Sequence, residues 1–366
     1  MWYNFLKAMA TRREFLKSLF FGAGGLTLRP QRNRFIPKVF RASSLGPREG
    51  LPNPFLSREG KPILVCIKGF DVRTMLSKGL QALGGLDKLV TSRQDVMIKP
   101  NLVLRESVFG SPQYPTMSSP DTIRELIYLL KDVAGRVSVG DQGGEDQSLI
   151  YEKLDLGNVV AGLGADLINF EAPSSGIYNV RNSTWSPTMP DFKVFSPVYN
   201  APILVNLCNL KRHSSAFMTG AIKNNFGALQ GRSISGTRGF LHRNPNYSTA
   251  FIEELAEVAA LINPELTIVD ARHIMIGNGP LLSAPGAEIK EGINRLVLSG
   301  DMVAVDAYCA ERILKIHDAS FLPSSISPTL EKAGQLGLGT ADLSQVEILE
   351  IDEFWEPLVK KGVVRR

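Results

Sequence analysis

The amino-acid sequence predicts an α/β fold, a single large domain in which a mostly parallel, twisted sheet carries helices on both faces. Three observations predict it. Short apolar runs rich in β-branched residues alternate with segments of helical spacing, which is typical of parallel strands joined by helical crossovers. The chain has 366 residues, enough for a large buried core. Its composition, 44% hydrophobic and 21% charged, is that of a globular protein rather than a disordered or fibrous one.

The first half of the domain begins at residue 61 and alternates between the two kinds of element. Apolar runs with β-branched residues predict strands at 61–68, 95–101, 136–140 and 165–169. Apolar residues three and four apart predict helices at 71–90, 120–133 and near 147–162. The second helix has the clearest start, with Ser119 as its N-cap and Pro120 at the first helical position.

The second half opens with a stretch rich in Pro, Ser and Asn, predicted as an excursion or hairpin over 172–200. The strongest strand of the chain is predicted at 202–210, and a long polar loop follows at 211–246. The later predicted elements are a helix at 247–262, strands at 266–270 and 295–299, and a helix at 302–316. No change of composition divides this body, so 61–350 is predicted as one domain and 351–366 as a C-terminal tail.

The N-terminus predicts export. Residues 11–17, Thr-Arg-Arg-Glu-Phe-Leu-Lys, match a twin-arginine signal, and an apolar stretch too short to span a membrane follows at 18–28. The alternative, an amphipathic helix, is disfavoured by three glycines in that stretch. We expect a signal peptide over 1–28, a linker rich in Arg, Pro and Ser over 29–60, and a periplasmic or other extracytoplasmic location. The twin-arginine translocase would then be a partner during export.

Charge and composition exclude several classes of protein. Residues 1–41 hold nine Lys/Arg and one acid, so the rest of the chain has 41 − 9 = 32 basic and 36 − 1 = 35 acidic residues, a net charge of −3. Such a body has no overall basic surface for nucleic acid. No apolar run approaches the ~18–20 residues of a membrane span, so none is expected in the mature form. Three distant cysteines make neither a disulfide framework nor a four-thiolate metal site.

Polar side chains follow five of the predicted strands. Ligands bind outside the carboxyl ends of the strands in open parallel sheets, so these side chains predict one shared site. A rim of solvated loops is the alternative. The five strand ends are Lys99-Pro100-Asn101, Asp141-Gln142-Gly143-Gly144, Asn209-Leu210-Lys211-Arg212-His213, Asp270-Ala271-Arg272-His273 and Gly300-Asp301.

The loop at 211–246 is the densest of these features. Residues 219–225 are interpreted as a helix start with free backbone N–H groups and Lys223 one turn in, a combination suited to a carboxylate or phosphate. An exposed helix face is the alternative. We expect catalytic roles for His213, His242 and Lys223, because histidine titrates closest to neutral pH. The expected ligand-binding residues are Lys99, Asn101, Asp141, Gly143, Gly144, Lys211, Asn224 and Arg238.

A divalent metal is a further hypothesis. Histidine and carboxylate ligands could come from Asp141, His213 and Asp301, although no spacing demands a metal site. The cofactor therefore stays open. An iron–sulfur cluster is not expected, since the chain has no C-x-x-C-x-x-C run.

Several of these motifs together resemble the domain of unknown function 362 family. They are Lys99-Pro-Asn-Leu-Val103, Gly140-Asp-Gln-Gly-Gly144, Lys211-x-His213, Thr219-x-x-Ile-Lys-Asn-x-Phe-Gly227, Arg238-x-x-x-His242, Asp301-x-Val-Ala-Val-Asp306 and Gly337-Leu-Gly339. The resemblance covers nearly all of 61–350 and implies the fold more than an activity. A fainter architectural resemblance to the N-terminal domain of nickel-dependent lactate racemase carries no residue over.

The function expected from the residues is an exported α/β protein acting as an enzyme on a small anionic ligand, with metal assistance left open. The alternative is a non-catalytic module that binds a ligand or metal and serves a redox partner in the cell envelope. Both need the same basic pocket, but only the enzyme needs a titrating group in it. Whether the protein is an enzyme is therefore not decided by the sequence.

Overall fold

The structure, a computed structural model, describes residues 39–103, 115–143, 146–172, 174–181, 191–231, 249–280 and 284–353, together with Leu241 and Leu282. The predicted signal at 1–28 lies outside these residues, as do Gly144, Arg238 and His242. Among the residues described, no helix is both long enough and apolar enough to cross a bilayer.

The main sheet of the described chain has ten strands, and its core runs in the order β13-β2-β12-β10-β8-β3-β4-β5. Short strand β11 pairs with β10, and short strand β9 pairs with β8. The strands are β2 (Ile63–Lys68), β3 (Val96–Lys99), β4 (Val137–Val139), β5 (Asp166–Leu167), β8 (Ile203–His213), β9 (Phe217–Thr219), β10 (Leu266–Ile276), β11 (Glu288–Lys290), β12 (Arg295–Ser299) and β13 (Glu347–Asp352). Along this core every pair is parallel except those of β12, which confirms the mostly parallel sheet.

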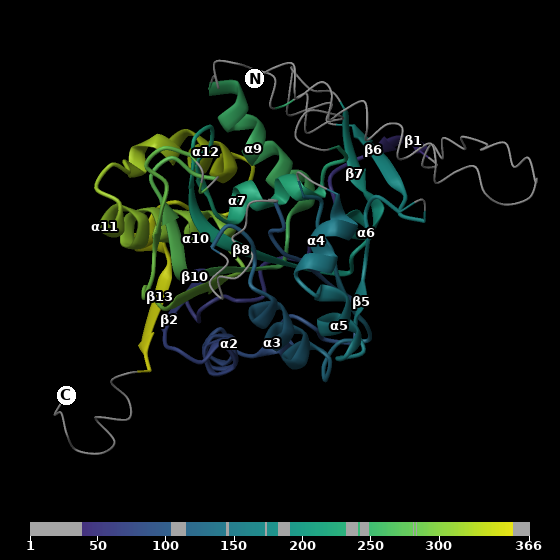
Figure 1. Cartoon of the computed structure of the whole chain (residues 1–366), viewed down its shortest axis with the longest axis horizontal. Coiled ribbons are helices and arrows are strands. Elements are labelled where there is room, and N and C mark those ends of the chain that lie inside the picture. The colour runs from purple at the N-terminus through teal and green to yellow at the C-terminus, as the bar shows by residue number, and fades with distance from the viewer. Residues whose placement is uncertain are drawn as a thin grey trace, which may run out of the picture. The chain divides into compact units, whose positions relative to one another are not determined.

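Helices cover both faces of the sheet, as predicted (Figure 1). One face carries α2 (Val72–Ala82), α3 (Pro120–Leu130), α4 (Gln147–Lys153) and α5 (Leu156–Ala161). The other carries α7 (Ala221–Asn224), α9 (Thr249–Ile262), α10 (Met302–Cys309) and α12 (Ser327–Gln335). Successive side chains of a strand point to opposite faces of the sheet, so each strand contributes to a hydrophobic core on either face. In β2, Val65 and Ile67 face the first set of helices, and Leu64 and Cys66 face the second.

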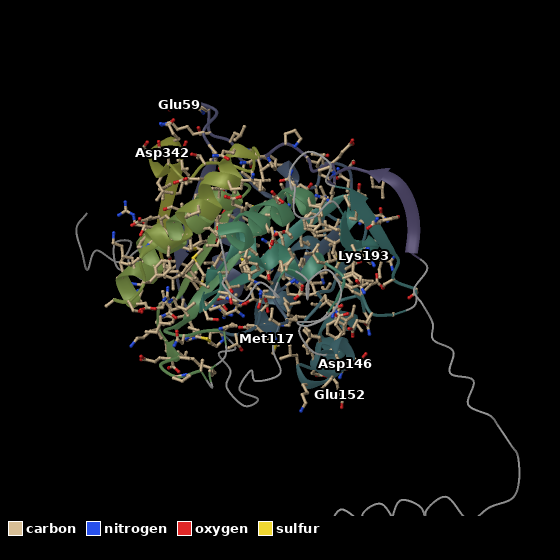
Figure 2. All side chains as sticks on the ribbon, turned by 90° about the horizontal axis from the view of Figure 1, so that it is seen from above. Glu59, Met117, Asp146, Glu152, Lys193 and Asp342 are labelled. Carbon is tan, nitrogen blue, oxygen red and sulfur yellow. The ribbon has the colours of Figure 1, made fainter. Side chains whose placement is uncertain are left out.

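Short helical segments complete the described chain. They are α6 (Ser196–Tyr199), α11 (Lys315–His317), the 3₁₀ turns η1 (Leu86–Lys88), η2 (Asn225–Ala228), η4 (Pro323–Ile326) and η5 (Leu343–Gln345), and the π turn η3 (Ala310–Leu314). Charged side chains lie at the periphery of the view in Figure 2, where Glu59, Asp146, Glu152, Lys193 and Asp342 are labelled and are exposed.

One strand direction differs from the prediction and moves a predicted site residue. Strand β12 is antiparallel to both β2 and β10, and its last residue Ser299 lies beside Leu64 and Thr267 at the amino ends of those strands. Asp301, two residues later, is therefore at the opposite edge of the sheet from the carboxyl ends of β3, β4 and β8. The expectation that Asp301 joins Asp141 and His213 was wrong. The apolar pattern predicts a strand at 295–299 but does not indicate whether it runs parallel or antiparallel to its neighbours.

Part of the predicted linker, residues 39–60, is folded and packs against the domain. Strand β1 (Val39–Leu45) pairs with β6 (Ile177–Arg181), which pairs with β7 (Asp191–Phe195) in a separate three-stranded sheet. The β6–β7 pair confirms the predicted hairpin. After β1, Arg48 is buried with an ion pair to Glu265 at 2.9 Å, and Phe55 is fully buried. The prediction of a linker excluded from the fold was therefore wrong for 39–60.

Other element boundaries also shift. The predicted helix at 147–162 is two helices, because Asp155 adopts a left-handed conformation with φ of 52° between α4 and α5. Strand β8 does not end at residue 210 but runs on to His213, since β9 pairs with its last three residues. Strand β13 was not predicted and crosses the expected domain end at residue 350. The extension of β8 carries Lys211 and His213 on a strand rather than on a loop.

Candidate functional site

Polar side chains from several segments line one pocket at the edge of the sheet where β3, β4 and β8 end. The pocket encloses about 340 Å³, with the open space at its mouth included. Its lining residues are Asn101, Val103, Asp141, Lys211, His213, Thr219, Lys223, Asn224, Phe226, Gly227 and Pro280. The structure thus brings together six of the predicted site residues, since Asn101, Asp141, Lys211, His213, Lys223 and Asn224 are all among them.

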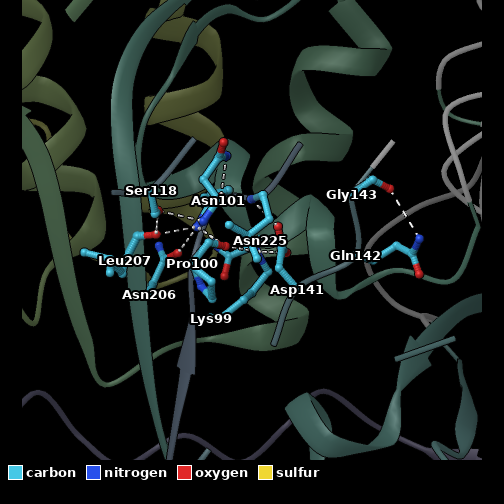
Figure 3. A network of polar contacts seen from close by, with 12 residues as sticks. Lys99, Pro100, Asn101, Ser118, Asp141, Gln142, Gly143, Asn206, Leu207 and Asn225 are labelled. Carbon is cyan, nitrogen blue, oxygen red and sulfur yellow. Dashed lines mark hydrogen bonds and ion pairs between the residues drawn. The ribbon is translucent and has the colours of Figure 1, made fainter. Parts of the chain in front are cut away.

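Beneath this pocket lies a buried ion pair. The ammonium group of Lys99, at the end of β3, is 2.7 Å from Asp141 Oδ1, and both side chains are almost wholly inaccessible to solvent. Asp141 Oδ2 accepts the backbone N–H of Leu102 at 2.8 Å. Asp141 Oδ2 is thus hydrogen-bonded, whereas Oδ1 has the charge of Lys99 beside it but accepts no hydrogen bond among the described residues (Figure 3).

Gly227 allows that pair to form. A Cβ on this residue would lie 2.0 Å from Asp141 Oδ1 and 2.7 Å from Lys99 Nζ, closer than any real side chain can approach. The carbonyl of Gly227 also accepts the backbone N–H of Gln142 at 3.2 Å. A Cβ on Gly143 would likewise lie 2.3 Å from the carbonyl oxygen of Leu102. The absence of a side chain lets the backbone lie against the ion pair at Gly227 and against the Leu102 carbonyl at Gly143.

Three buried asparagines form a chain of hydrogen bonds, the asparagine chain, that links the loop after β3 to α7 and β8. Asn101 Nδ2 donates to Asn224 Oδ1 at 2.7 Å, and Asn224 Nδ2 donates to Asn206 Oδ1 at 2.7 Å. Asn206 Nδ2 in turn donates to the carbonyl of Ala221 at 2.8 Å. The residues come from the loop after β3, from α7 and from β8 (Asn101 and Asn206 are labelled in Figure 3). The chain ties three separate segments to one geometry.

Lys211 stands at the end of this chain. Its side chain is buried, and Nζ donates to Asn101 Oδ1 at 3.1 Å and to the carbonyl of Thr116. Burial lowers the pKa of Lys211 from its ordinary value to about 7, opposed in part by the charge of Asp141. A lysine with such a pKa exists in both protonation states near neutral pH.

His213 is held in one orientation. Its Nδ1 accepts the backbone N–H groups of Ser215 and Ala216 at 3.1 and 3.2 Å. Because Nδ1 accepts, the neutral ring carries its hydrogen on Nε2. The geometry therefore favours His213 as a hydrogen-bond donor through Nε2, and its expected catalytic role stays a prediction.

Lys223 lies in the pocket, but the helix start before it does not provide an anion site. Helix α7 has four residues, and its first N–H groups, those of Ala221 and Ile222, donate to the buried carboxylate of Asp306 at 2.6 and 2.9 Å. The expectation of free N–H groups at 220–224 was wrong, because a side chain from α10 already caps them. Lys223 itself is half-buried, with Nζ 4.5 Å from the ring centre of Phe226.

The metal hypothesis finds no assembled ligand set in the described part of the chain. No group of three or more His, Cys, Asp or Glu side chains clusters there in a way that could hold an ion. Asp141 is paired with Lys99, and Asp301 instead caps α10, accepting the N–H groups of Ala304 and Thr340. His242, the other predicted histidine, lies outside the described residues.

Some site residues were missed by sequence reasoning. Asn206 looked like one polar residue within an apolar strand, although a buried amide there signals a hydrogen-bond partner. Thr219, Phe226 and Gly227 were quoted in motifs but given no role, and Pro280 carried no signal. The burial of Lys211 was also missed, because the residue was placed in a loop.

Comparisons with known proteins place the chain in a family. The family model described as a domain of unknown function (DUF362) matches residues 96–311. A thylakoid-associated protein of Synechocystis sp. is 25% identical over 287 residues, which make up 76% of this chain and 81% of that protein.

Among solved structures, the apoprotein of lactate racemase from Thermoanaerobacterium thermosaccharolyticum aligns with a TM-score of 0.35 and 12% identity. The alignment covers 67% of this chain and 57% of the racemase chain, less than two thirds of that chain's length. The family match spans more than half of the 366 residues and includes every segment that lines the pocket, so the chain belongs to the domain of unknown function 362 family.

Proposed function

We propose that this protein is an enzyme that binds a small carboxylate or phosphate in the pocket between β3, β8 and α7. The observation that carries the proposal is the convergence of Lys211, His213 and Lys223, which come from β8 and α7, on one lining. Two lysines and a hydrogen-bond donor are the groups that recognise a small anion.

The charge balance of the pocket supports an anionic ligand. Its described lining contains two lysines and one carboxylate, Asp141, and that carboxylate already pairs with the buried Lys99. An anion bound there would offset the positive charge of the lining lysines, which is costly to hold in a partly buried site. The pocket has little enclosed space, which restricts the ligand to a small molecule.

Catalysis, rather than binding alone, is supported by Lys211. A lysine whose pKa lies near 7 can give or take a proton at the working pH, which an ordinary lysine rarely does. Lys223 and His213 would hold the anion, and Lys211 would be the group that titrates. The pair of Lys99 and Asp141 would hold the loops after β3 and β4 in place.

The test is a binding titration of the purified protein with pyruvate, lactate and inorganic phosphate, followed by calorimetry or ligand-observed NMR. We expect at least one of these anions to bind, and Lys223→Met to weaken its binding at least ~10-fold, the effect of ~1.4 kcal/mol. Lys315→Met is the matched control, because Lys315 is exposed on α11. Equal binding by wild type and Lys223→Met, or no binding of any of the three, would contradict the proposal.

Export by the twin-arginine pathway is also our proposal, and it rests on residues 11–28 of the sequence. Residues 1–60 fused to a folded reporter should carry it out of the cytoplasm. Replacing both Arg12 and Arg13 by lysine should abolish that export, whereas the same change at Arg32 and Arg34 should not. Equal export by both double variants would refute the assignment.

A further inference from the structure

The asparagine chain fixes which way its amides point. The carbonyl of Ala221 can only accept, so Asn206 must present its Nδ2 to it and its Oδ1 to Asn224. Asn224 then presents its Oδ1 to Asn101, and Asn101 presents its Oδ1 to Lys211. The carbonyl of Ala221 alone thus fixes the orientation of all three amides, whichever protonation state Lys211 has. The oxygen of Asn101 is therefore held toward Lys211 independently of how the amides are assigned.

This arrangement suits a neutral amine at Lys211. A neutral amine has two N–H bonds and one lone pair, whereas an ammonium has three N–H bonds to satisfy. The described residues supply two acceptors, Asn101 Oδ1 and the carbonyl of Thr116. With both N–H groups so engaged, the lone pair takes the remaining tetrahedral direction. Lys211 also lines the pocket, so a molecule bound there would lie beside this amine.

We propose that Lys211 is a nucleophile that forms an imine with the carbonyl carbon of a small oxo acid held in this pocket. The proposal rests on the proposed function and deepens it by naming the substrate class. A carbonyl group beside a carboxylate fits the lining, because Lys223 and His213 can donate hydrogen bonds to a carboxylate and line the same pocket as the amine of Lys211. The carboxylate of the lining, Asp141, is paired with Lys99, and its charge opposes the lowering of the Lys211 pKa only in part.

The step needs no further reactant. The lone pair of Lys211 Nζ attacks the carbonyl carbon, and the carbon–oxygen π bond breaks to give a carbinolamine after a proton moves from nitrogen to oxygen. The carbon–oxygen single bond then breaks, and the second nitrogen-bound hydrogen leaves with that oxygen as water. The product is a carbon–nitrogen double bond and one molecule of water, with no change of oxidation state.

The test traps the imine by borohydride reduction. The purified protein is incubated with pyruvate or glyoxylate, reduced, digested and mapped by mass spectrometry. We expect one adduct, on Lys211, whose rate of formation rises with pH and levels off above about 7, since only the neutral amine attacks. Exposed lysines should instead keep gaining reactivity up to their ordinary pKa. Propanoate, which has the carboxylate but no carbonyl carbon, should slow the trapping by competition.

The outcome is read from wild-type peptides, so it does not depend on whether a Lys211 variant folds. Lys211→Arg should abolish the adduct, and Lys315→Arg should leave it unchanged. No adduct on Lys211, or adducts spread equally over exposed lysines, would overturn the imine. If pyruvate or propanoate nevertheless binds in a Lys223-dependent way, the proposed anion site survives that failure. If no tested anion binds, the proposed function itself fails.

Discussion

At the residue scale, Gly227→Ala tests how tightly the backbone packs against the Lys99–Asp141 pair. Gly227→Ala would set a Cβ 2.0 Å from Asp141 Oδ1, so we expect the Lys99–Asp141 pair to separate. Disrupting a buried pair costs about 3–5 kcal/mol, and the free energy of unfolding in urea should fall by that order. Gly157→Ala is the matched control, since a Cβ in α5 meets nothing within 4 Å and should be neutral or stabilising by up to ~1 kcal/mol.

A similar loss in both variants would show that the cost comes from glycine in general. The comparison also shows what the sequence alone reveals at this scale. Lys99, Asp141 and Gly227 all stand in motifs, and the first two were predicted as site residues. Their pairing under the pocket was not predicted, because a lysine and a carboxylate at two strand ends look equally suited to a ligand. Only burial distinguishes a pair that supports the site from one that touches the ligand.

Lys211 provides a second prediction at this scale, a pH dependence of stability. Its pKa falls from 10.5 in the unfolded chain to about 7 in the fold, so between these values the unfolded state binds more protons. Stability attributable to Lys211 should therefore rise as pH increases from 7 to 10.5, and its cost is fully present below pH 7. Lys211→Met should remove this rise, as measured by urea unfolding across that range. A variant with the same pH profile as wild type would contradict the assignment.

At the scale of elements, the cap of α7 connects the site to α10, which packs on the same face of the sheet. Asp306 of α10 accepts both N–H groups at the start of α7, and burial raises its pKa to about 7. Asp306→Asn keeps the volume but replaces one acceptor with a donor, leaving a buried N–H unpaired. We expect a loss of about 1–3 kcal/mol in the free energy of unfolding, with Lys223 displaced and anion binding weakened.

Asp71→Asn is the control for that change. Asp71 is an exposed N-cap of α2, where asparagine caps as well as aspartate, so stability should barely change. Equal effects of the two substitutions would rule out a special role for Asp306. The sequence predicted both helices but not this contact, because the partner of Ala221 lies 85 residues away. Local capping signals predict a helix start, whereas a cap from a distant helix leaves no local pattern.

At the scale of the whole molecule, periodicity predicted the layered α/β architecture, since strands and helices bury one face each wherever they occur. It could not predict strand direction, so β12 and Asp301 were placed at the wrong edge. It also missed the segment before β2, because Arg, Pro and Ser are common in linkers. Each error arises where long-range contacts, rather than local preference, decide the structure.

The segment 39–60 permits a direct test of this view of the molecule. A chain that begins at residue 61 would lose β1, the buried Phe55 and the guanidinium of Arg48, which donates to Ala201, Ile262 and Asn263 carbonyls besides pairing with Glu265. We expect that chain to be far less stable in urea than one beginning at residue 37. Within the full chain, Arg48→Met should cost about 3–5 kcal/mol by leaving Glu265 buried without its partner. Arg58 in the same segment is exposed, so Arg58→Met should leave the free energy of unfolding nearly unchanged. Equal stability of the two chains, or of the two variants, would show that 39–60 is a linker after all.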